Sequence, residues 1–370
     1  MRKTNKPGYT LVLALMVIAL IVAIVTVLAD RGSIHMHYVK TMIDREKAKA
    51  LAWSGVQIAM SELAHFGDVQ KKEETISKEQ GKEKKSSAGQ EAKQELISLL
   101  PILNKWQIFD LKRRTDGVTG QIKICLGSED GKLNLNGLVD FKAGKISEEN
   151  KKILKEVFGK IQKIIGSKNL FESFEKFVKE SKTRLQDLTQ LLSIKEFELF
   201  GDRIFYVPDD PIGKDETGKL KQNVYLQDLF TLWSSQKELD PWMLSHSQKI
   251  LFGFPSSPAA TLSGLSKADL EKKLKEILKN FSGTIQFPKE WDEMLASVYG
   301  VKFDSLPKQM KAMLGTKFEP KVFSVVSYGT VGGVIQKLLV ILERKKSFQK
   351  DSSGKNVASF EFSAKKFYWL

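Results

Sequence analysis

The chain has 370 residues, long enough for one large domain or two smaller ones around a sizeable core. It carries 59 Lys and Arg against 44 Asp and Glu, a formal net charge of +15. Without an arginine-rich tract or a zinc-finger spacing, this excess indicates a solvated lysine-rich surface and no role in binding nucleic acid. The single cysteine, Cys125, excludes an intramolecular disulfide, and its apolar neighbours predict a buried structural thiol.

The N-terminal segment has the pattern of a membrane anchor. Basic residues at positions 2, 3 and 6 precede an uninterrupted apolar run over residues 9–29. A helix of that length spans roughly 31 Å, the thickness of a bilayer core. The positive charges before it place the start of the chain in the cytoplasm and the rest outside. The apolar run is too long for an ordinary signal peptide, and its end at Ala29 is a poor cleavage site, so a plain uncleaved anchor is the stronger alternative.

The break before the apolar run carries a more specific signal. A short basic leader ends at Pro7-Gly8 and is followed by Tyr9, Thr10 and a Leu/Val/Ile helix. This arrangement resembles the leader of type IV prepilins. The resemblance implies that a membrane peptidase cuts between Gly8 and Tyr9, that the new N-terminal amine is methylated, and that the apolar helix remains as anchor and assembly element.

One position departs from the type IV pilin pattern. Most pilins have Glu as the fifth mature residue, where its carboxylate pairs with the amine of a neighbouring subunit, whereas this chain has Leu13. An unpaired carboxylate in lipid is costly. Its absence therefore suggests a subunit with no partner above it in the filament, and the K-type minor pseudopilins of type II secretion are known for lacking this Glu.

A helical stem and a charged loop are predicted after the anchor. Small and apolar residues recur at spacings of three and four between Ala48 and Leu63, so one helix is expected to continue over residues 30–66. Residues 67–94 are rich in Lys, Glu, Ser, Gln and Gly and should form a disordered loop, because they bury too little apolar surface to offset the entropy of ordering.

Residues 95–146 are predicted to form the first part of a sheet. A strand pattern over 120–126 is followed by the turn signal Asp130-Gly131 and by a second strand over 132–136, which together indicate a hairpin. The segment containing Asp130, Gly131, Asn134 and Asn136 resembles a hallmark motif of K-type pseudopilins. The asparagine amides are expected to satisfy backbone groups there rather than to act as catalysts.

The rest of the chain divides into a helical part and a second sheet part. Residues 147–285 carry amphipathic helical patterns with stripes of phenylalanine that indicate core, and K-type pseudopilins have a helical domain inserted at this place. Residues 286–370 return to strand chemistry, with Gly332-Gly333 as a turn and an aromatic end.

One acidic loop suggests a cation. Its carboxylates, Asp209, Asp210, Asp215 and Glu216, fall within eight residues of one another among glycines, which suits calcium but fails the EF-hand spacing. The K-type family carries a calcium-binding acidic loop that these residues match loosely, and a solvated turn is the alternative. The sequence contains no catalytic motif, so no enzyme activity is expected, and calcium is the one cofactor that the sequence suggests.

Together these features predict an α+β, pilin-like fold with a long N-terminal transmembrane and stem helix, an antiparallel sheet and a large inserted helical domain. The resemblance implies a single-pass inner-membrane protein with a periplasmic domain, at the tip of a type II secretion pseudopilus. Its expected partners are I- and J-type minor pseudopilins, the major pseudopilin, the prepilin peptidase and the inner-membrane secretion platform. A type IV pilus minor pilin and a single-pass membrane-anchored periplasmic binding protein are the alternatives.

Overall fold

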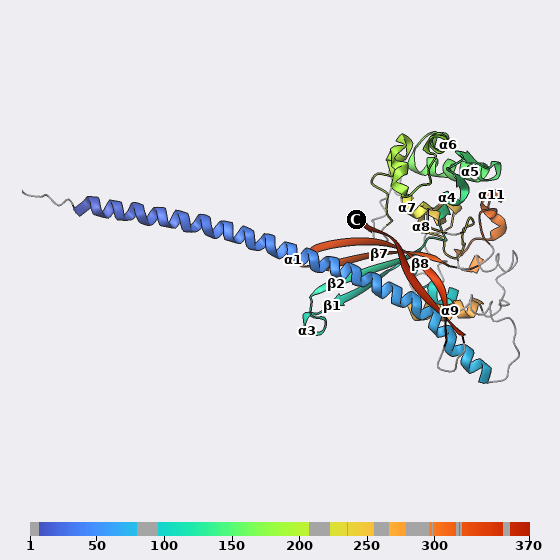
Figure 1. The fold of residues 1–370 in the computed structure, drawn as a ribbon, viewed down its shortest axis with the longest axis horizontal. Helices are drawn as coiled ribbons and strands as arrows, with labels where there is room; N and C mark the ends of the chain where they lie inside the picture. The colour runs from blue at the N-terminus through green and yellow to red at the C-terminus, as the bar shows by residue number, and fades with distance from the viewer. Residues whose placement is uncertain are drawn as a thin grey trace, which may run out of the picture.

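The computed structural model describes residues 7–79, 95–206, 223–234, 236–254, 266–278, 296–297, 299–315, 318, 320–350 and 356–370. Its dominant feature is one helix, α1 (Pro7–Glu79), whose first half projects as a rod away from the rest of the protein (Figure 1). Residues 11–43 are all exposed, and the helix is long and apolar enough to cross a membrane once.

The helix continues past the predicted end of the stem at residue 66 and includes residues 67–79, so the disordered loop predicted for 67–94 is wrong over that stretch. Lys, Glu and Gln, which dominate there, are good helix formers, and a helix already formed adds residues without a new nucleation step. Residues 80–94 lie outside the described residues.

A five-stranded antiparallel sheet packs against the second half of α1 (Figure 1). Its strands follow the order β1 (Trp106–Leu111), β2 (Gly120–Ser128), β7 (Val322–Val331), β8 (Val334–Lys350) and β9 (Asn356–Trp369). The contact is close at Gly329, where an added Cβ would lie 2.0 Å from the carbonyl oxygen of Ala48. Gly332 and Gly333 join β7 to β8 with φ of 56° and 85°, as the predicted turn requires.

The sheet is interrupted between β2 and β7 by an inserted, mostly helical domain, most of which lies in the upper right of Figure 1. Phe158 lies at its centre, with the rings of Phe171, Phe174, Phe197 and Phe230 between 5.0 and 6.2 Å away. The phenylalanine stripes are therefore core, as predicted. The elements of the insertion are β3 (Leu133–Asn134), α4 (Leu135–Leu138), β4 (Val139–Asp140), β5 (Lys145–Ile146), α5 (Glu148–Ile165), α6 (Leu170–Ser181), η1 (Leu188–Ser193), η2 (Lys195–Phe200), α7 (Leu226–Leu229), β6 (Phe230–Thr231), α8 (His246–Phe252), α9 (Lys267–Leu278), η3 (Phe303–Ser305) and α11 (Lys308–Lys311). A short helix, α3 (Arg113–Asp116), joins β1 to β2.

Two expectations about this region are corrected. The predicted hairpin around Asp130-Gly131 does not form: β3 pairs in parallel with β6, 97 residues later in sequence, rather than with β2. The second part of the sheet begins at Val322 rather than at 286, because α11 packs on α5 and Leu314 bridges to Leu239 within the insertion. The α+β class, the long N-terminal helix and the inserted helical domain are confirmed.

Candidate functional site

The predicted processing site lies at the start of α1. Gly8 and Tyr9 follow the first helical residue, Pro7. Leu13 lies one turn further on, with 52% of its side chain exposed. The helix around Leu13 is therefore an apolar surface that the protein itself leaves uncovered, with no carboxylate on it.

The four predicted motif residues, Asp130, Gly131, Asn134 and Asn136, lie where the insertion leaves the sheet. Asp130 is fully buried two residues after the end of β2, and one carboxylate oxygen accepts hydrogen bonds from the backbone N–H groups of Lys321 (2.7 Å) and Val322 (3.0 Å). Its other carboxylate oxygen accepts one from the Ser234 hydroxyl (2.7 Å), and its carbonyl oxygen accepts one from the N–H of Asp240 (2.8 Å). Asp130 lies where the chain leaves the sheet, and it binds the backbone where the chain returns to the sheet at Val322. It also binds Ser234 and Asp240 within the insertion.

Burial raises the pKa of the Asp130 carboxyl, while the hydrogen bonds from Lys321, Val322 and Ser234 act in the opposite direction. The pKa of the carboxyl of Asp240 is raised well above its ordinary value, again mainly by burial. One oxygen of Asp240 accepts a hydrogen bond from the N–H of Trp242 (3.0 Å), and the other has no partner in the described part of the chain.

The remaining motif residues also have structural contacts. An added Cβ on Gly131 would lie 1.7 Å from the carbonyl oxygen of Met243, so only glycine fits between the two segments. Asn134 caps α4 by accepting a hydrogen bond from the N–H of Gly137 (3.1 Å), and its amide donates to the carbonyl of Ser234 (2.5 Å). The amide of Asn136 donates to the carbonyl of Leu185 (3.0 Å). Both asparagines satisfy backbone groups, as expected.

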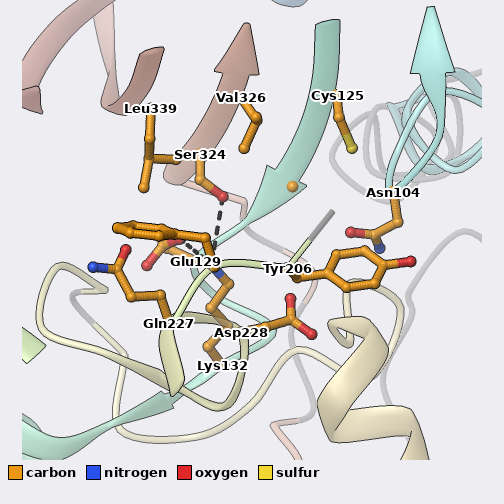
Figure 2. Close-up of a pocket in the computed structure, with 12 residues that line it drawn as sticks. Asn104, Cys125, Glu129, Lys132, Tyr206, Gln227, Asp228, Ser324, Val326 and Leu339 are labelled. Atoms are coloured by element: carbon orange, nitrogen blue, oxygen red, sulfur yellow. Dashed lines mark hydrogen bonds and ion pairs between the residues drawn. The ribbon is translucent and has the colours of Figure 1, made fainter. Parts of the chain in front are cut away.

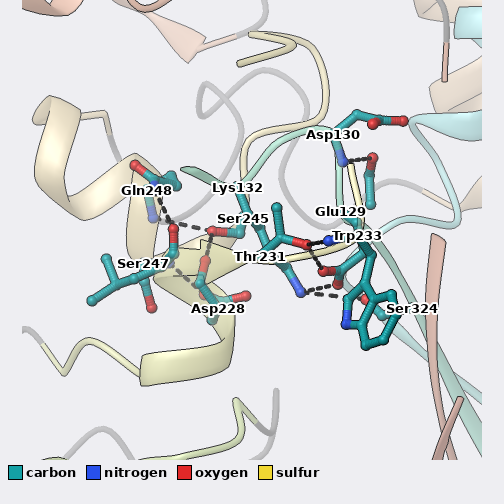
Figure 3. Close-up of polar contacts among 12 residues, drawn as sticks. Glu129, Asp130, Lys132, Asp228, Thr231, Trp233, Ser245, Ser247, Gln248 and Ser324 are labelled. Carbon is teal, nitrogen blue, oxygen red and sulfur yellow. Dashed lines mark hydrogen bonds and ion pairs between the residues drawn. The ribbon is translucent and has the colours of Figure 1, made fainter. Parts of the chain in front are cut away.

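A buried ionic cluster that the sequence does not predict lies beside the motif. Figure 3 shows the Glu129 carboxylate between the Lys132 ammonium and the Thr231 hydroxyl, which donates at 2.5 Å. Lys132 also reaches the hydroxyl of Ser324 on β7 (3.4 Å). No local pattern could have found this cluster, because Thr231 and Ser324 are remote in sequence from Glu129 and Lys132.

A small cavity lies between the sheet and the insertion beside this cluster (Figure 2). Its volume is about 40 Å³, room for a few water molecules rather than for an organic substrate. Cys125 lines it from β2 and is buried, as predicted for its thiol. Within the described ranges, no group of three or more His, Cys, Asp or Glu side chains is placed to hold a metal ion. The predicted calcium ligands Asp209, Asp210, Asp215 and Glu216 lie outside those ranges.

No protein-family model and no curated protein matches this sequence. Among solved structures, the chain is similar to one in the crystal structure of the GspK-GspI-GspJ complex from the type 2 secretion system of enterotoxigenic Escherichia coli. The two share 12% sequence identity with a TM-score of 0.39, and the match covers 75% of this chain and 93% of that chain.

Proposed function

We propose that this protein is a non-enzymatic, membrane-anchored subunit of a pilin-like filament, and more specifically a K-type minor pseudopilin at the tip of a type II secretion pseudopilus. The observation that carries the proposal is the exposed apolar half of α1, which continues without a break into the part that packs on the sheet. A helix built this way joins the membrane rigidly to the folded domain and offers an assembly surface.

The leader and Leu13 support the finer assignment. A prepilin peptidase would cut after Gly8, leaving Tyr9 as the methylated N-terminus of the anchor. A subunit with Leu13 brings no carboxylate for the amine of a subunit above it, which suits the top of a filament. The partners we propose are I- and J-type minor pseudopilins beside it, the major pseudopilin below it and the inner-membrane secretion platform. The folded domain would lie in the periplasm.

The buried polar cluster supports a structural rather than a catalytic role. The motif residues Asp130, Asn134 and Asn136 direct their polar atoms to backbone groups, and the ammonium of Lys132 meets the carboxylate of Glu129. The contacts of Asp130 and Lys132 join the insertion to the sheet, and those of Asn134 and Asn136 hold segments of the insertion together. We propose that the insertion thereby gives the tip its shape, and that calcium binding at residues 209–216 would be a further stabilising feature of it.

Deleting the gene in its own host tests this function. We expect secreted enzymes to accumulate in the periplasm and the full chain to restore their export. A Gly8→Asp variant, in which we expect the leader to stay uncleaved, should not restore it. Loss of surface pili with normal export would favour the type IV minor pilin. Normal export and normal pili, with the chain retained in the membrane, would favour an anchored periplasmic binding protein and contradict the proposal.

A further inference from the structure

One end of the five-stranded sheet lies nearest to the membrane anchor. The turn between β7 and β8 is at this end, and its Gly332 lies against the side chain of Asp44 on α1. The short helix α3, which joins β1 to β2, is at the same end, because Gln121 pairs with Thr330 close to that turn. Figure 1 shows α3 on the side of the sheet from which the bare half of α1 projects. Along the helix, Asp44 is about 22 Å from Ala29, the predicted end of the membrane span.

This end of the sheet carries exposed cations. Arg113 and Arg114 are exposed on α3, and neither makes an ion pair with any residue that the structure describes. Asp116, on the same helix, accepts hydrogen bonds from the N–H of Lys112 (2.7 Å) and the hydroxyl of Thr115 (2.9 Å). These bonds brace α3 internally and leave both guanidinium groups facing solvent.

The positive charge continues on the sheet face turned away from α1. Lys123 on β2 and Lys337 on β8 both pair in register with Tyr328 on β7, and the Lys337 ammonium lies 4.9 Å from the centre of the Tyr328 ring. Lys123 alternates along its strand with Ile124, which packs against Gly55 of α1. Because successive side chains of a strand point to opposite faces, Lys123 and its two partners point away from α1.

Two exposed isoleucines lie on the same face. Ile108 pairs with Lys123 and is 53% exposed, and Ile335 precedes Lys337 by two residues and is 50% exposed. The insertion covers this face further from the anchor, where Tyr206 lines the cavity. The part near the anchor therefore stays open. We call it the basic sheet surface, which consists of Ile108, Arg113, Arg114, Lys123, Ile335 and Lys337.

We propose that the basic sheet surface binds the anionic phospholipid surface of the membrane that anchors α1. The proposal rests on the anchoring of α1 that the proposed function assumes, and it does not depend on the filament. Headgroups add about 5–7 Å to each side of a bilayer core, so an upright α1 would hold this end of the sheet about 15 Å above the lipid. Transmembrane helices tilt by up to about 40°, and a tilt toward the sheet lowers the basic sheet surface onto the lipid.

The chemistry of the basic sheet surface fits a membrane. Guanidinium groups form paired hydrogen bonds with phosphate oxygens, and the two lysines add attraction to anionic headgroups. The two isoleucines fit the boundary between headgroups and acyl chains, where apolar side chains of surface-bound proteins lie. Asp110, a carboxylate on this face, accepts a hydrogen bond from the Gln121 amide (2.7 Å) and leaves a surplus of cations. The membrane is the anionic partner that α1 keeps within reach.

Fluorescence quenching by lipid tests the contact. The full-length protein, with Cys125→Ala and Thr119→Cys, would carry a fluorophore at exposed position 119, beside α3. It would be reconstituted through α1 into vesicles with nitroxide-labelled headgroups, made of phosphatidylcholine alone or with about 30% phosphatidylglycerol. We expect quenching at least about twofold stronger with phosphatidylglycerol, and a fall to the phosphatidylcholine level in about 0.5 M salt.

A second labelling position is the control. A fluorophore at Glu172→Cys, an exposed position on α6 of the insertion, should be quenched equally in the two lipids. Equal quenching of position 119 in the two lipids, or the same lipid dependence at positions 119 and 172, would overturn the proposal.

Charge reversal then tests the arginines. Arg113→Glu with Arg114→Glu should abolish the phosphatidylglycerol-dependent part of the quenching at position 119. Lys142→Glu with Lys145→Glu, an equal change of charge at exposed residues of the insertion, should leave it unchanged. Equal effects of the two double reversals would contradict the role of Arg113 and Arg114.

The two proposals fail separately. If the leader is cleaved and export requires the protein while quenching ignores phosphatidylglycerol, the lipid contact alone is wrong and the proposed function stands. Quenching that depends on phosphatidylglycerol in a protein with an uncleaved leader would support the lipid contact and contradict the filament.

Discussion

The Asp130 carboxylate accepts a hydrogen bond from the backbone N–H of Val322 at 3.0 Å, which joins the residue where the chain leaves the sheet to the residue where it returns. Between these two residues lies the whole inserted domain. The same carboxylate oxygen also accepts the N–H of Lys321, so a single buried side chain closes the base of the insertion.

Replacing Asp130 by alanine should therefore destabilise the fold. Asp130→Ala leaves two backbone N–H groups and the Ser234 hydroxyl without this acceptor, and we expect a loss of about 2–4 kcal/mol in the free energy of unfolding. Urea unfolding of the full chain in detergent, followed by tryptophan fluorescence, measures it. Asp202→Ala removes an exposed carboxylate and serves as the control; equal effects of the two substitutions would contradict the role given to Asp130.

A pair of glycine substitutions should have opposite effects. Gly131→Ala places a methyl group against the carbonyl of Met243 and should cost about 3 kcal/mol or more. Gly159→Ala lies within α5, where a Cβ has nothing within 4 Å, and should stabilise the protein by up to about 1 kcal/mol. The same urea titration compares them, and a harmless Gly131→Ala would mean that the insertion sits differently on the sheet.

Asp240 should make the protein less stable as the pH rises. Because its pKa in the folded state is raised above its ordinary value, the folded protein holds the proton more tightly than the unfolded chain. The contribution of the Asp240 carboxyl to the free energy of unfolding is full below about pH 3.8 and is lost as the pH rises through the folded-state pKa. Asp240→Asn keeps an acceptor for the Trp242 N–H but cannot ionise. The Tm of Asp240→Asn, relative to that of the wild type, should rise between pH 4 and pH 8. A Tm difference that stays constant over this range would contradict the raised pKa of Asp240.

Lys249 should make the protein more stable as the pH rises, which is the opposite of the effect of Asp240. Burial lowers the pKa of its ammonium to about 8, so the charged form is disfavoured in the folded state. The resulting loss of stability is full below pH 8 and is relieved as the pH rises toward the ordinary value of 10.5. Lys249→Met retains the aliphatic packing beside Tyr299, over whose ring the ammonium lies at 5.3 Å. The variant should be more stable than the wild type at pH 7, and this advantage should shrink by pH 9.5. An unchanged advantage at pH 9.5 would show that the charge is not the cause.

The sequence predicts the parts of this fold whose signals are local. The apolar run before Ala29, the Gly332-Gly333 turn and the alternation along β2 each depend on neighbouring residues, and the structure agrees with them. The Asp130-Gly131 turn signal failed because its segment finds a distant partner in β6, which no short-range pattern reveals. The contact of Asp130 with Ser234 was hidden for the same reason, since it joins residues 104 positions apart. The predicted stem end at residue 66 is wrong because the helix propensity of residues 67–79 prevails over their polar composition.

The N-terminus of the mature protein tests the central claim most directly. The full chain, purified from its host membrane, would be examined by intact-mass and N-terminal peptide mass spectrometry. A pilin-like subunit should begin at a methylated Tyr9, with α1 retained as the anchor. An intact Met1, or a chain that begins after Ala29, would contradict the assignment of this protein to a pilin-like filament.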